Sequence, residues 1–450
     1  MEKLNKMGTM PMPKLVFDMS WPMMVSLLVQ SLYNIVDSIF VARLSENALT
    51  ATSLAFPVQL LMIAFSVGTS VGINAVLSQS IGAQRKEEIK LIATTGVLLS
   101  LVGTLVFMVL GLGFSGQIVG LFTKDEVLGG LCQQYLSVCM TFCVGTFIGT
   151  MFQRFLQATG DTFSSMITLV AGALTNIVLD PIMIFGLLGF PAMGIVGAAI
   201  ATVIGQWVTA FLAVWLNITK NPTVKLKIQG YHLDAGILMK IFKVGLPTII
   251  MEALGSIMVI AMNMILLPFS STAVAFFGVY YKLQNFLFLP TKGLGQAAIP
   301  IAGFSCGSKN RKRVEELMRV VIPAATVIAV VASIIFLAIP EPLLSLFSAS
   351  EEMLALGVPA LRIIAPTFVF ASVTTVLGYI VSGLGNGMIN MLGTAIRQFI
   401  VLIPCAYILA QTGGIGSVWY SMWISEIGAC VYAVFHARFV LKAVWKEMEK

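Results

Sequence analysis

Three polar side chains occupy one face of an otherwise apolar segment near the start of the chain. Gln30, Asn34 and Asp37 are four and three residues apart, so in a helix they form a single polar stripe. A carboxylate at the centre of a lipid bilayer costs about 2.5–3.5 kcal/mol, so a membrane helix carries one only for a physical reason. We therefore expect this face to point into the protein, where Asp37 can bind a cation or a proton.

A second acid lies in another apolar segment and also has an amide one turn before it. Asn176 and Asp180 share a helical face, and Pro181 follows at once. Proline leaves a backbone carbonyl of the preceding turn without its helical partner, and such carbonyls can bind cations. Asp37, Asn176 and Asp180 together predict a site for H+ or Na+. The alternative is that both acids only hold neighbouring helices together by hydrogen bonds.

A coupling mechanism follows if the two acids lie close together. Two carboxyl groups that are shielded from water cannot easily both be charged, so one of them is expected to hold a proton near neutral pH. Gain or loss of that proton changes the buried charge and allows the surrounding helices to repack. One charge that moves through 100 mV contributes about 2.3 kcal/mol, which is enough to drive exchange against a gradient.

The second half of the chain carries a different set of polar residues. Glu252, Ser256 and Asn263 share one face of an apolar segment, whereas the position that corresponds to Asp37 is Met262. Glu252 could attract a cationic substrate or relay a proton, or it could lie near the membrane surface in contact with water. We assign these three residues and Gln30 to a substrate cavity. Other charged residues near apolar segments are expected to pair with each other or with helix ends: Lys282, Arg362, Arg397 and Glu426.

The elements that must position these residues are membrane-spanning helices. The chain is 58% hydrophobic and 10% charged, unlike soluble domains, which are roughly 25% charged. A spanning helix needs about 20 apolar residues, and lipid offers the backbone no hydrogen-bond partner other than itself. Twelve segments satisfy this length: 15–42, 51–80, 91–121, 131–156, 163–187, 193–217, 238–267, 273–304, 314–339, 354–382, 388–410 and 416–440.

The two halves of the sequence repeat each other. Residues 22–160 align with residues 247–385 at a constant shift of 225 without a gap. Examples are Ser45 with Ser270 and Gly160 with Gly385. A duplication of about six hydrophobic segments is typical of transporters built from two similar bundles, with a site between them that opens to either side. We predict an all-α membrane protein with 12 transmembrane helices in two pseudo-symmetric six-helix bundles.

The repeat also predicts the domain organisation. The N-lobe is expected at residues 1–217 with spans one to six, and the C-lobe at residues 237–450 with spans seven to twelve. Residues 218–236 form the longest polar connection and are expected to be a cytoplasmic linker. One chain that contains both bundles has no need of a symmetric partner, so a monomer is expected.

The distribution of positive charge predicts the orientation in the membrane. Lys and Arg gather in alternate connections, whereas the opposite connections hold only Arg43 and Lys124. Positive residues stay on the cytoplasmic side during insertion, so both termini are expected in the cytoplasm of a multi-pass plasma-membrane protein with lipids around it. The basic loops are short and lack interleaved aromatic residues, which argues against nucleic-acid binding.

The cysteines and histidines do not suggest a metal or cofactor site. No C-x-x-C motif occurs among the six cysteines, and neither His232 nor His436 has a partner at metal-ligand spacing. We expect no structural metal, no catalytic residue and no cofactor apart from the coupling ion, with Na+ able to bind at Asp37, Asn176 and Asp180.

Several sequence runs resemble the multidrug and toxic compound extrusion (MATE) family, in particular its bacterial members. They are residues 33–43 around Asp37, residues 156–161, 176–181, 197–202 and 281–286, and Arg397 with Gln398 ahead of Pro404. The resemblance spans almost the whole chain, and the order and spacing of the runs are specific. It implies the same duplicated helical fold.

The resemblance also implies an activity and a site. MATE proteins are antiporters that expel organic cations and amphipathic drugs in exchange for H+ or Na+. Their N-lobe cation site corresponds to Asp37, Asn176, Asp180 and Thr202, and Asn34 lies on the same helical face as Asp37. The alternatives are a flippase for lipid-linked oligosaccharides, which should display more cationic residues along its cavity, and a membrane-embedded enzyme, which needs a clustered catalytic set.

Overall fold

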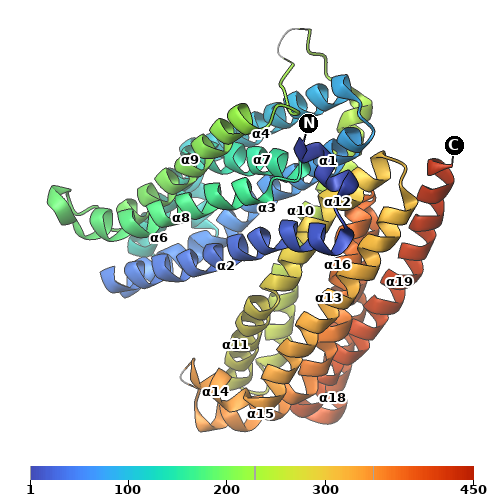
Figure 1. Cartoon of the computed structure of the whole chain (residues 1–450). Helices are drawn as coiled ribbons and strands as arrows, with labels where there is room; N and C mark the ends of the chain where they lie inside the picture. Colours follow the sequence, from blue (N-terminus) through green and yellow to red (C-terminus); the bar gives the residue numbers. More distant parts are fainter. Residues whose placement is uncertain (1, 228–229, 348, 450) are drawn as a thin grey trace. The chain divides into compact units, whose positions relative to one another are not determined.

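The computed structural model describes residues 2–227, 230–347 and 349–449, and the regular structure in these ranges is helical. The helices of the first half are α1 (Glu2–Thr9), α2 (Met12–Leu44), α3 (Glu46–Gly82), α4 (Lys86–Gly113), α5 (Ser115–Gly120), α6 (Glu126–Thr141), α7 (Val144–Ala158), α8 (Thr162–Phe185), η1 (Leu187–Gly189) and α9 (Gly194–Lys220). Figure 1 shows them in blue to green.

The helices of the second half begin after the polar connection. They are α10 (Ala235–Leu266), α11 (Ser271–Leu287), α12 (Leu289–Gly307), α13 (Arg311–Ala338), α14 (Pro340–Ser345), α15 (Glu351–Ile364), η2 (Ala365–Thr367), α16 (Phe368–Gly383), α17 (Gly387–Ala395), the π-helical η3 (Ile396–Leu402), α18 (Ile403–Val418) and α19 (Tyr420–Met448).

The all-helical membrane fold predicted from the sequence is confirmed. Within the described ranges ten helices are long and apolar enough to cross a membrane, and α6 with α7, bent by 45°, makes an eleventh if the pair is one span. The predicted span 273–304 falls on α11 and α12, which meet at Phe288 and do not qualify singly. The number of twelve spans therefore remains a prediction.

The sequence duplication is visible in the ends of the helices. The Ser45 hydroxyl caps α3 by accepting a hydrogen bond from the backbone N–H of Ala48, at 3.0 Å. The Ser270 hydroxyl caps α11 by accepting the same bond from Ala273, at 3.1 Å. A capping hydroxyl satisfies one of the free N–H groups in the first helical turn. The two halves of the chain therefore share both the serine and its role as a helix cap.

The turns that end corresponding helices also match. Gly160 has a φ of 85° and Gly385 has a φ of 90°, a backbone conformation that glycine adopts without steric cost. The N–H groups of the next residues, Asp161 and Asn386, donate back to Leu156 and Val381 respectively. Glycine therefore occupies this position in both halves because a left-handed turn follows α7 and α16.

The structure divides into two compact units, and each takes the start of a helix from the opposite half of the sequence. The first unit contains Met1–Asn5 and Val25–Ile249, and the second contains Lys6–Met24 and Ile250–Lys450. The divisions fall within α2 and α10, close to Pro22 and Pro247, which correspond in the repeat. The predicted lobe boundaries, 1–217 and 237–450, remain a prediction.

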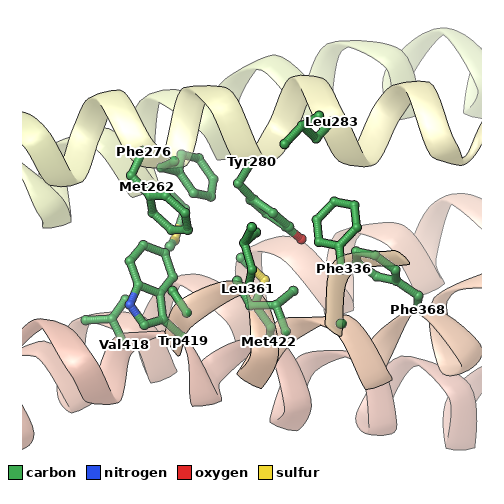
Figure 2. Close-up of a cluster of buried hydrophobic side chains, with 14 of the residues drawn as sticks. Met262, Phe276, Tyr280, Leu283, Phe336, Leu361, Phe368, Val418, Trp419 and Met422 are labelled. Atoms are coloured by element: carbon green, nitrogen blue, oxygen red, sulfur yellow. The ribbon is translucent and has the colours of Figure 1, made fainter. Parts of the chain in front are cut away.

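The first unit is a bundle in which α8 packs along α9, and α3 packs against α4, α6 and α7. Its core contains small and aromatic side chains, including Phe107, Tyr135 and Phe147. In the second unit α16 packs against α12, α13 and α19, which lie side by side in Figure 1. Aromatic residues fill its core, with Phe276 edge-on to Trp419 and Phe336 edge-on to Phe368 (Figure 2).

The first part of α10 packs in the first unit and the first part of α2 packs in the second unit, each against a glycine. The two glycines correspond in the repeat. In the first unit a β-carbon on Gly68 of α3 would lie 2.9 Å from the carbonyl oxygen of Gly245 of α10 and would also meet Ile249. In the second unit a β-carbon on Gly293 of α12 would lie 2.8 Å from the backbone nitrogen of Met24 of α2. Such close backbone contact requires glycine, as is common in membrane helices. The crossings are related by the 225-residue repeat.

Candidate functional site

Two carboxyl groups meet inside the first unit. Asp37 lies on α2 and Asp180 on α8, and their side chains approach closely enough to hydrogen-bond to each other. Asp180 is fully buried and Asp37 is partly buried. The structure thus brings together the two acids that the sequence predicted as a pair.

Asn176 and Thr202 complete the polar cluster. The amide of Asn176 donates to Asp180 Oδ1 and to Thr202 Oγ1, both at 3.3 Å. Asn176 reaches Asp180 because the two residues lie one turn apart on α8. Thr202 lies on α9, the helix that packs most extensively on α8. Small residues allow this approach: a β-carbon on Gly205 of α9 would lie 2.7 Å from the carbonyl oxygen of Gly172 of α8.

Three buried oxygen atoms in this cluster have no hydrogen-bond partner among the described residues. They are Asp37 Oδ1, Asp180 Oδ2 and Asn176 Oδ1. A buried oxygen without a partner is costly, and several in one place indicate a missing proton, water or cation. Two carboxylates with neutral amide and hydroxyl oxygens form a donor set that suits either a proton or a hard cation such as Na+.

A second layer of polar side chains surrounds the two acids. Tyr33, one turn before Asp37 on α2, is half-buried and lies close enough for the charges of both acids to act on it. Tyr135 and Cys139, one turn apart on α6, both hydrogen-bond to Gln59 of α3 and lie within range of the Asp37 charge. The four-residue spacing of Tyr33 and Asp37 could have predicted that the tyrosine lies beside the acid. Gln59 lies on another helix, and no local sequence pattern links it to the acids.

The remaining residues of the predicted stripe lie apart from the acid pair. Asn34 is exposed and Gln30 is partly exposed, and no contact between their amides and the acids is found in the described part of the chain. Their predicted roles, in ion coupling for Asn34 and in a substrate cavity for Gln30, remain predictions.

The second unit holds the other predicted substrate residues. Glu252 on α10 is exposed, and Asn263 has a buried Oδ1 atom without a partner among the described residues. The side chain of Ser256 lies outside the part of the structure that is described. The predicted substrate role of these three residues therefore stays a prediction.

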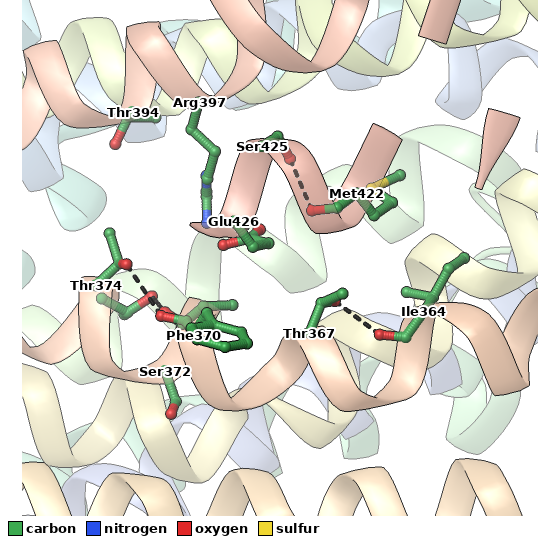
Figure 3. Close-up of polar contacts among 12 residues, drawn as sticks. Ile364, Thr367, Phe370, Ser372, Thr374, Thr394, Arg397, Met422, Ser425 and Glu426 are labelled. Carbon is green, nitrogen blue, oxygen red and sulfur yellow. Dashed lines mark hydrogen bonds and ion pairs between the residues drawn. The ribbon is translucent and has the colours of Figure 1, made fainter. Parts of the chain in front are cut away.

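Two charged residues of the second unit pair with each other, as the sequence led us to expect. Arg397 on η3 donates to Glu426 on α19 at 3.3 Å, and Glu426 is 8% exposed (Figure 3). Lys292 on α12, which was not among the residues predicted from the sequence, donates from its ammonium group to Asn285 Oδ1 at 3.1 Å. Its position within a predicted span is a recognisable signal, because a charged residue there is costly.

Comparison with known proteins identifies the architecture. The MatE family model matches residues 22–182 and 247–408, which begin 225 residues apart, as the internal repeat does. The chain is 25% identical over 429 residues to the multidrug export protein MepA of Staphylococcus haemolyticus (strain JCSC1435), covering 94% of this chain and 92% of the relative. The MepA of Staphylococcus aureus (strain bovine RF122 / ET3-1) is 25% identical over 449 residues, covering 98% and 96%.

Solved structures of MATE proteins have the same fold as this chain. An outward-facing multidrug resistance MATE family transporter of the MOP superfamily superposes with a TM-score of 0.91 at 26% identity, covering 99% of both chains. A MATE protein in complex with MaL6 gives a TM-score of 0.91 at 25% identity, covering 98% of this chain and 99% of that one. Members of this family are transporters and not enzymes. The chain is a multi-pass membrane protein that belongs to the MatE family, the multidrug and toxic compound extrusion transporters.

Proposed function

We propose that this protein exports organic cations and amphipathic drugs in exchange for H+ or Na+ by alternating access, with Asp37 and Asp180 as the coupling site. The observation that carries the proposal is the direct approach of these two carboxyl groups within one helical unit. The two MepA relatives, which align with nearly the whole chain, are multidrug export proteins.

A proton is the coupling ion that the acid pair favours. A hydrogen bond between two carboxyl groups requires a proton on one of them, and two adjacent carboxylates shielded from water repel each other strongly. Na+ is the second candidate, because Thr202 and Asn176 add neutral oxygens beside the acids. In either case a single bound cation lowers the charge of the pair from −2 to −1 and removes the repulsion between two carboxylates.

The proposed cycle links this change of charge to transport. When the pair binds its ion, the buried charge falls and the helices around α2 and α8 pack in one arrangement. When the ion leaves, the two carboxylates repel each other and are better stabilised in another arrangement, which binds the cationic drug. Because the ion and the drug favour different arrangements, each displaces the other and exchange results.

The two alternative functions lack comparable support. A flippase that holds a pyrophosphate group needs several cations along its cavity, whereas the polar cluster of the first unit is acidic. The enzyme alternative lacks support from the family, because the members of the family that matches this chain are transporters.

The proposed setting of the transporter is the plasma membrane, with both termini in the cytoplasm and the monomer as the working unit. The concentration of Lys and Arg in alternate connections supports this orientation. Labelling of single cysteines placed at residues 9 and 446 in intact cells tests it, since a label that does not cross the membrane should modify neither.

Ethidium efflux from liposomes that contain the purified protein tests the proposed function. We expect efflux when a pH step or a sodium step is applied, and only passive leakage when neither gradient is present. Separate steps identify the coupling ion. The absence of efflux under both gradients, with folded protein in the liposomes, would contradict the proposal.

A further inference from the structure

A polar stripe runs along a buried side of α3 in the first unit. Its members follow each other at four-residue intervals: Ser66, Ser70, Asn74 and Ser78. All four are buried, the last three completely. This spacing places their side chains one turn apart on the same side of the helix. Polar groups inside a membrane are costly, so a whole row of them needs a physical reason.

One member of the stripe carries a hydrogen-bonding group without a partner. Asn74 Oδ1 accepts from the Ser78 hydroxyl at 3.3 Å, whereas Asn74 Nδ2 is buried and has no partner among the described residues. The Ser70 hydroxyl donates to the carbonyl oxygen of Ser66 at 2.7 Å, and its oxygen can accept a further bond. A buried amide that lacks an acceptor indicates that water occupies this part of the stripe.

Polar side chains connect the acid pair with the first residue of the stripe. Asn176 donates to Thr202 on α9, and Gln206 lies one turn after Thr202 on the same helix. Gln206 Oε1 accepts from the hydroxyl of Thr146 on α7 at 2.7 Å. The backbone oxygen of Thr146 lies 3.5 Å from the hydroxyl oxygen of Ser66. Polar groups at one-turn or hydrogen-bond spacing therefore link the two acids with α3.

The stripe leads toward the end of α3 that we expect in the cytoplasm. Ser78 lies in the last part of α3, which ends at Gly82 directly before Arg85 and Lys86. Positive residues mark the cytoplasmic side of a membrane protein. Asp37 lies toward the opposite membrane surface, in the last third of α2, whose first residues follow the cytoplasmic N-terminus. The stripe thus spans the distance between the acids and the cytoplasmic surface.

The internal repeat offers a comparison, because the second unit lacks both the acid and the stripe. Asp37 corresponds to Met262 at the shift of 225. The four stripe positions correspond to Thr291, Gly295, Ile299 and Gly303. Packing of the shared fold does not require a polar row, since α12 forms without one. The polarity of α3 therefore accompanies the acid pair and not the architecture that the two halves share.

We propose that the α3 stripe, with Thr146 and Gln206, is the route by which the coupling ion passes between the acid pair and the cytoplasm. The inference rests on the proposed function and deepens it, because it assigns the residues that carry the ion once it has left the acids. A proton can pass along hydroxyl groups and intervening water molecules, each of which accepts one hydrogen bond and donates another. Na+ would move between the side-chain oxygens instead.

Asn74→Leu tests the route, because leucine has nearly the shape of asparagine and binds neither water nor an ion. Removal of a buried amide with an unpaired group should leave the unfolding temperature in detergent unchanged or raise it. Gradient-driven ethidium efflux from liposomes should fall by about tenfold or more, because an apolar step raises the barrier for an ion. Ethidium binding should be retained. Asn74→Ser, which returns a polar group, should recover most of the efflux.

Ser372→Ala is the matched control for Ser70→Ala. Both serines are completely buried, and both hydroxyls donate to a carbonyl oxygen of their own helix, but Ser372 lies on α16 in the second unit. Ser70→Ala should lower efflux by about threefold or more, and Ser372→Ala should stay within about twofold of the wild type. Equal losses in the two variants would show that the hydroxyls serve packing alone and would overturn the route.

The reactivity of single cysteines tests the route without transport. In protein whose native cysteines are replaced by serine, Ser70→Cys and Asn74→Cys should react with a small water-soluble methanethiosulfonate, because a hydrated thiol ionises and an apolar surrounding prevents this. Ile73→Cys and Leu77→Cys, completely buried on the same helix but off the stripe, should stay unreactive. Equal reactivity at all four positions, or at none of them, would overturn the route.

Failure of the route and failure of the proposed function give different results. Wild-type efflux by Asn74→Leu, in liposomes in which the wild type responds to the gradient, would overturn the route and leave the proposed function intact. Absence of efflux by the wild type under both gradients would overturn both.

Discussion

Asp37 and Asp180 are far apart in the sequence, yet their carboxyl groups lie close enough to hydrogen-bond to each other inside one helical unit. On the α8 side, Asp180 shares a face with Asn176, and α8 packs closely on α9 through Gly172 and Gly205. The contact turns two costly buried acids into a single site that can share one proton or one Na+, so that the two carboxyl groups no longer repel each other as two bare carboxylates would.

Asp180→Asn is predicted to abolish proton release that accompanies drug binding. In the wild type, binding of ethidium at neutral pH should displace the proton that the acid pair shares. The asparagine cannot share that proton, so the variant should bind ethidium with little release. The measurement is the pH change in a weakly buffered detergent solution on addition of the dye. Undiminished release by Asp180→Asn would place the titrating group elsewhere.

Thr202→Val is predicted to separate proton coupling from sodium coupling. Valine has nearly the shape of threonine but lacks the hydroxyl that accepts the hydrogen bond from Asn176. Under proton coupling, efflux driven by a pH step should persist with a loss of about tenfold at most, because the loss of one hydrogen bond costs about 0.5–1.5 kcal/mol. A requirement for tenfold more sodium would instead show that the hydroxyl is a ligand of Na+.

Gly293→Ala is predicted to destabilise the second unit. The new methyl group would lie 2.8 Å from the backbone nitrogen of Met24, so either α2 or α12 must move, at a typical cost of about 1–3 kcal/mol. Gly278→Ala is the matched control, since its methyl group would meet nothing within 4 Å. The measurement is the thermal unfolding temperature in detergent. Equal temperatures for the two variants would show that the crossing tolerates a side chain.

Arg397→Met is predicted to destabilise the protein more than the double variant Arg397→Met with Glu426→Gln. The single change leaves the buried Glu426 carboxylate without its partner, which typically costs about 3–5 kcal/mol. The second change removes the charge that was left unpaired. Unfolding temperatures of the two variants, together with Glu426→Gln alone, measure the coupling. No recovery in the double variant would mean that the pair is not the source of the effect.

The sequence predicted those features that depend on local pattern. Apolar length predicted the helices, and helical spacing placed Asn176 beside Asp180. The 225-residue repeat aligned Ser45 with Ser270, and the structure shows that both serines cap helices. The contact between Asp37 and Asp180 was also expected, because a buried acid is costly unless it has a partner.

The sequence could not predict features that depend on contacts between distant segments. The exchange of helix segments near Pro22 and Pro247 depends on which bundle the start of each helix packs against, and sequence spacing does not encode this choice. Gln59 reaches Tyr135 and Cys139 only because α3 packs on α6. Lys292 was detectable as a charge within a span, but its hydrogen-bond partner, Asn285, lies on another helix.

The most direct test of the coupling site is gradient-driven ethidium efflux by Asp37→Asn in liposomes, compared with the wild type and with Glu126→Gln, a control at an exposed acid. The account predicts efflux by the wild type and by Glu126→Gln. It predicts none by Asp37→Asn under either a pH step or a sodium step, although the variant is folded and still binds ethidium. Full efflux by Asp37→Asn under the gradient that drives the wild type would remove this residue from the mechanism.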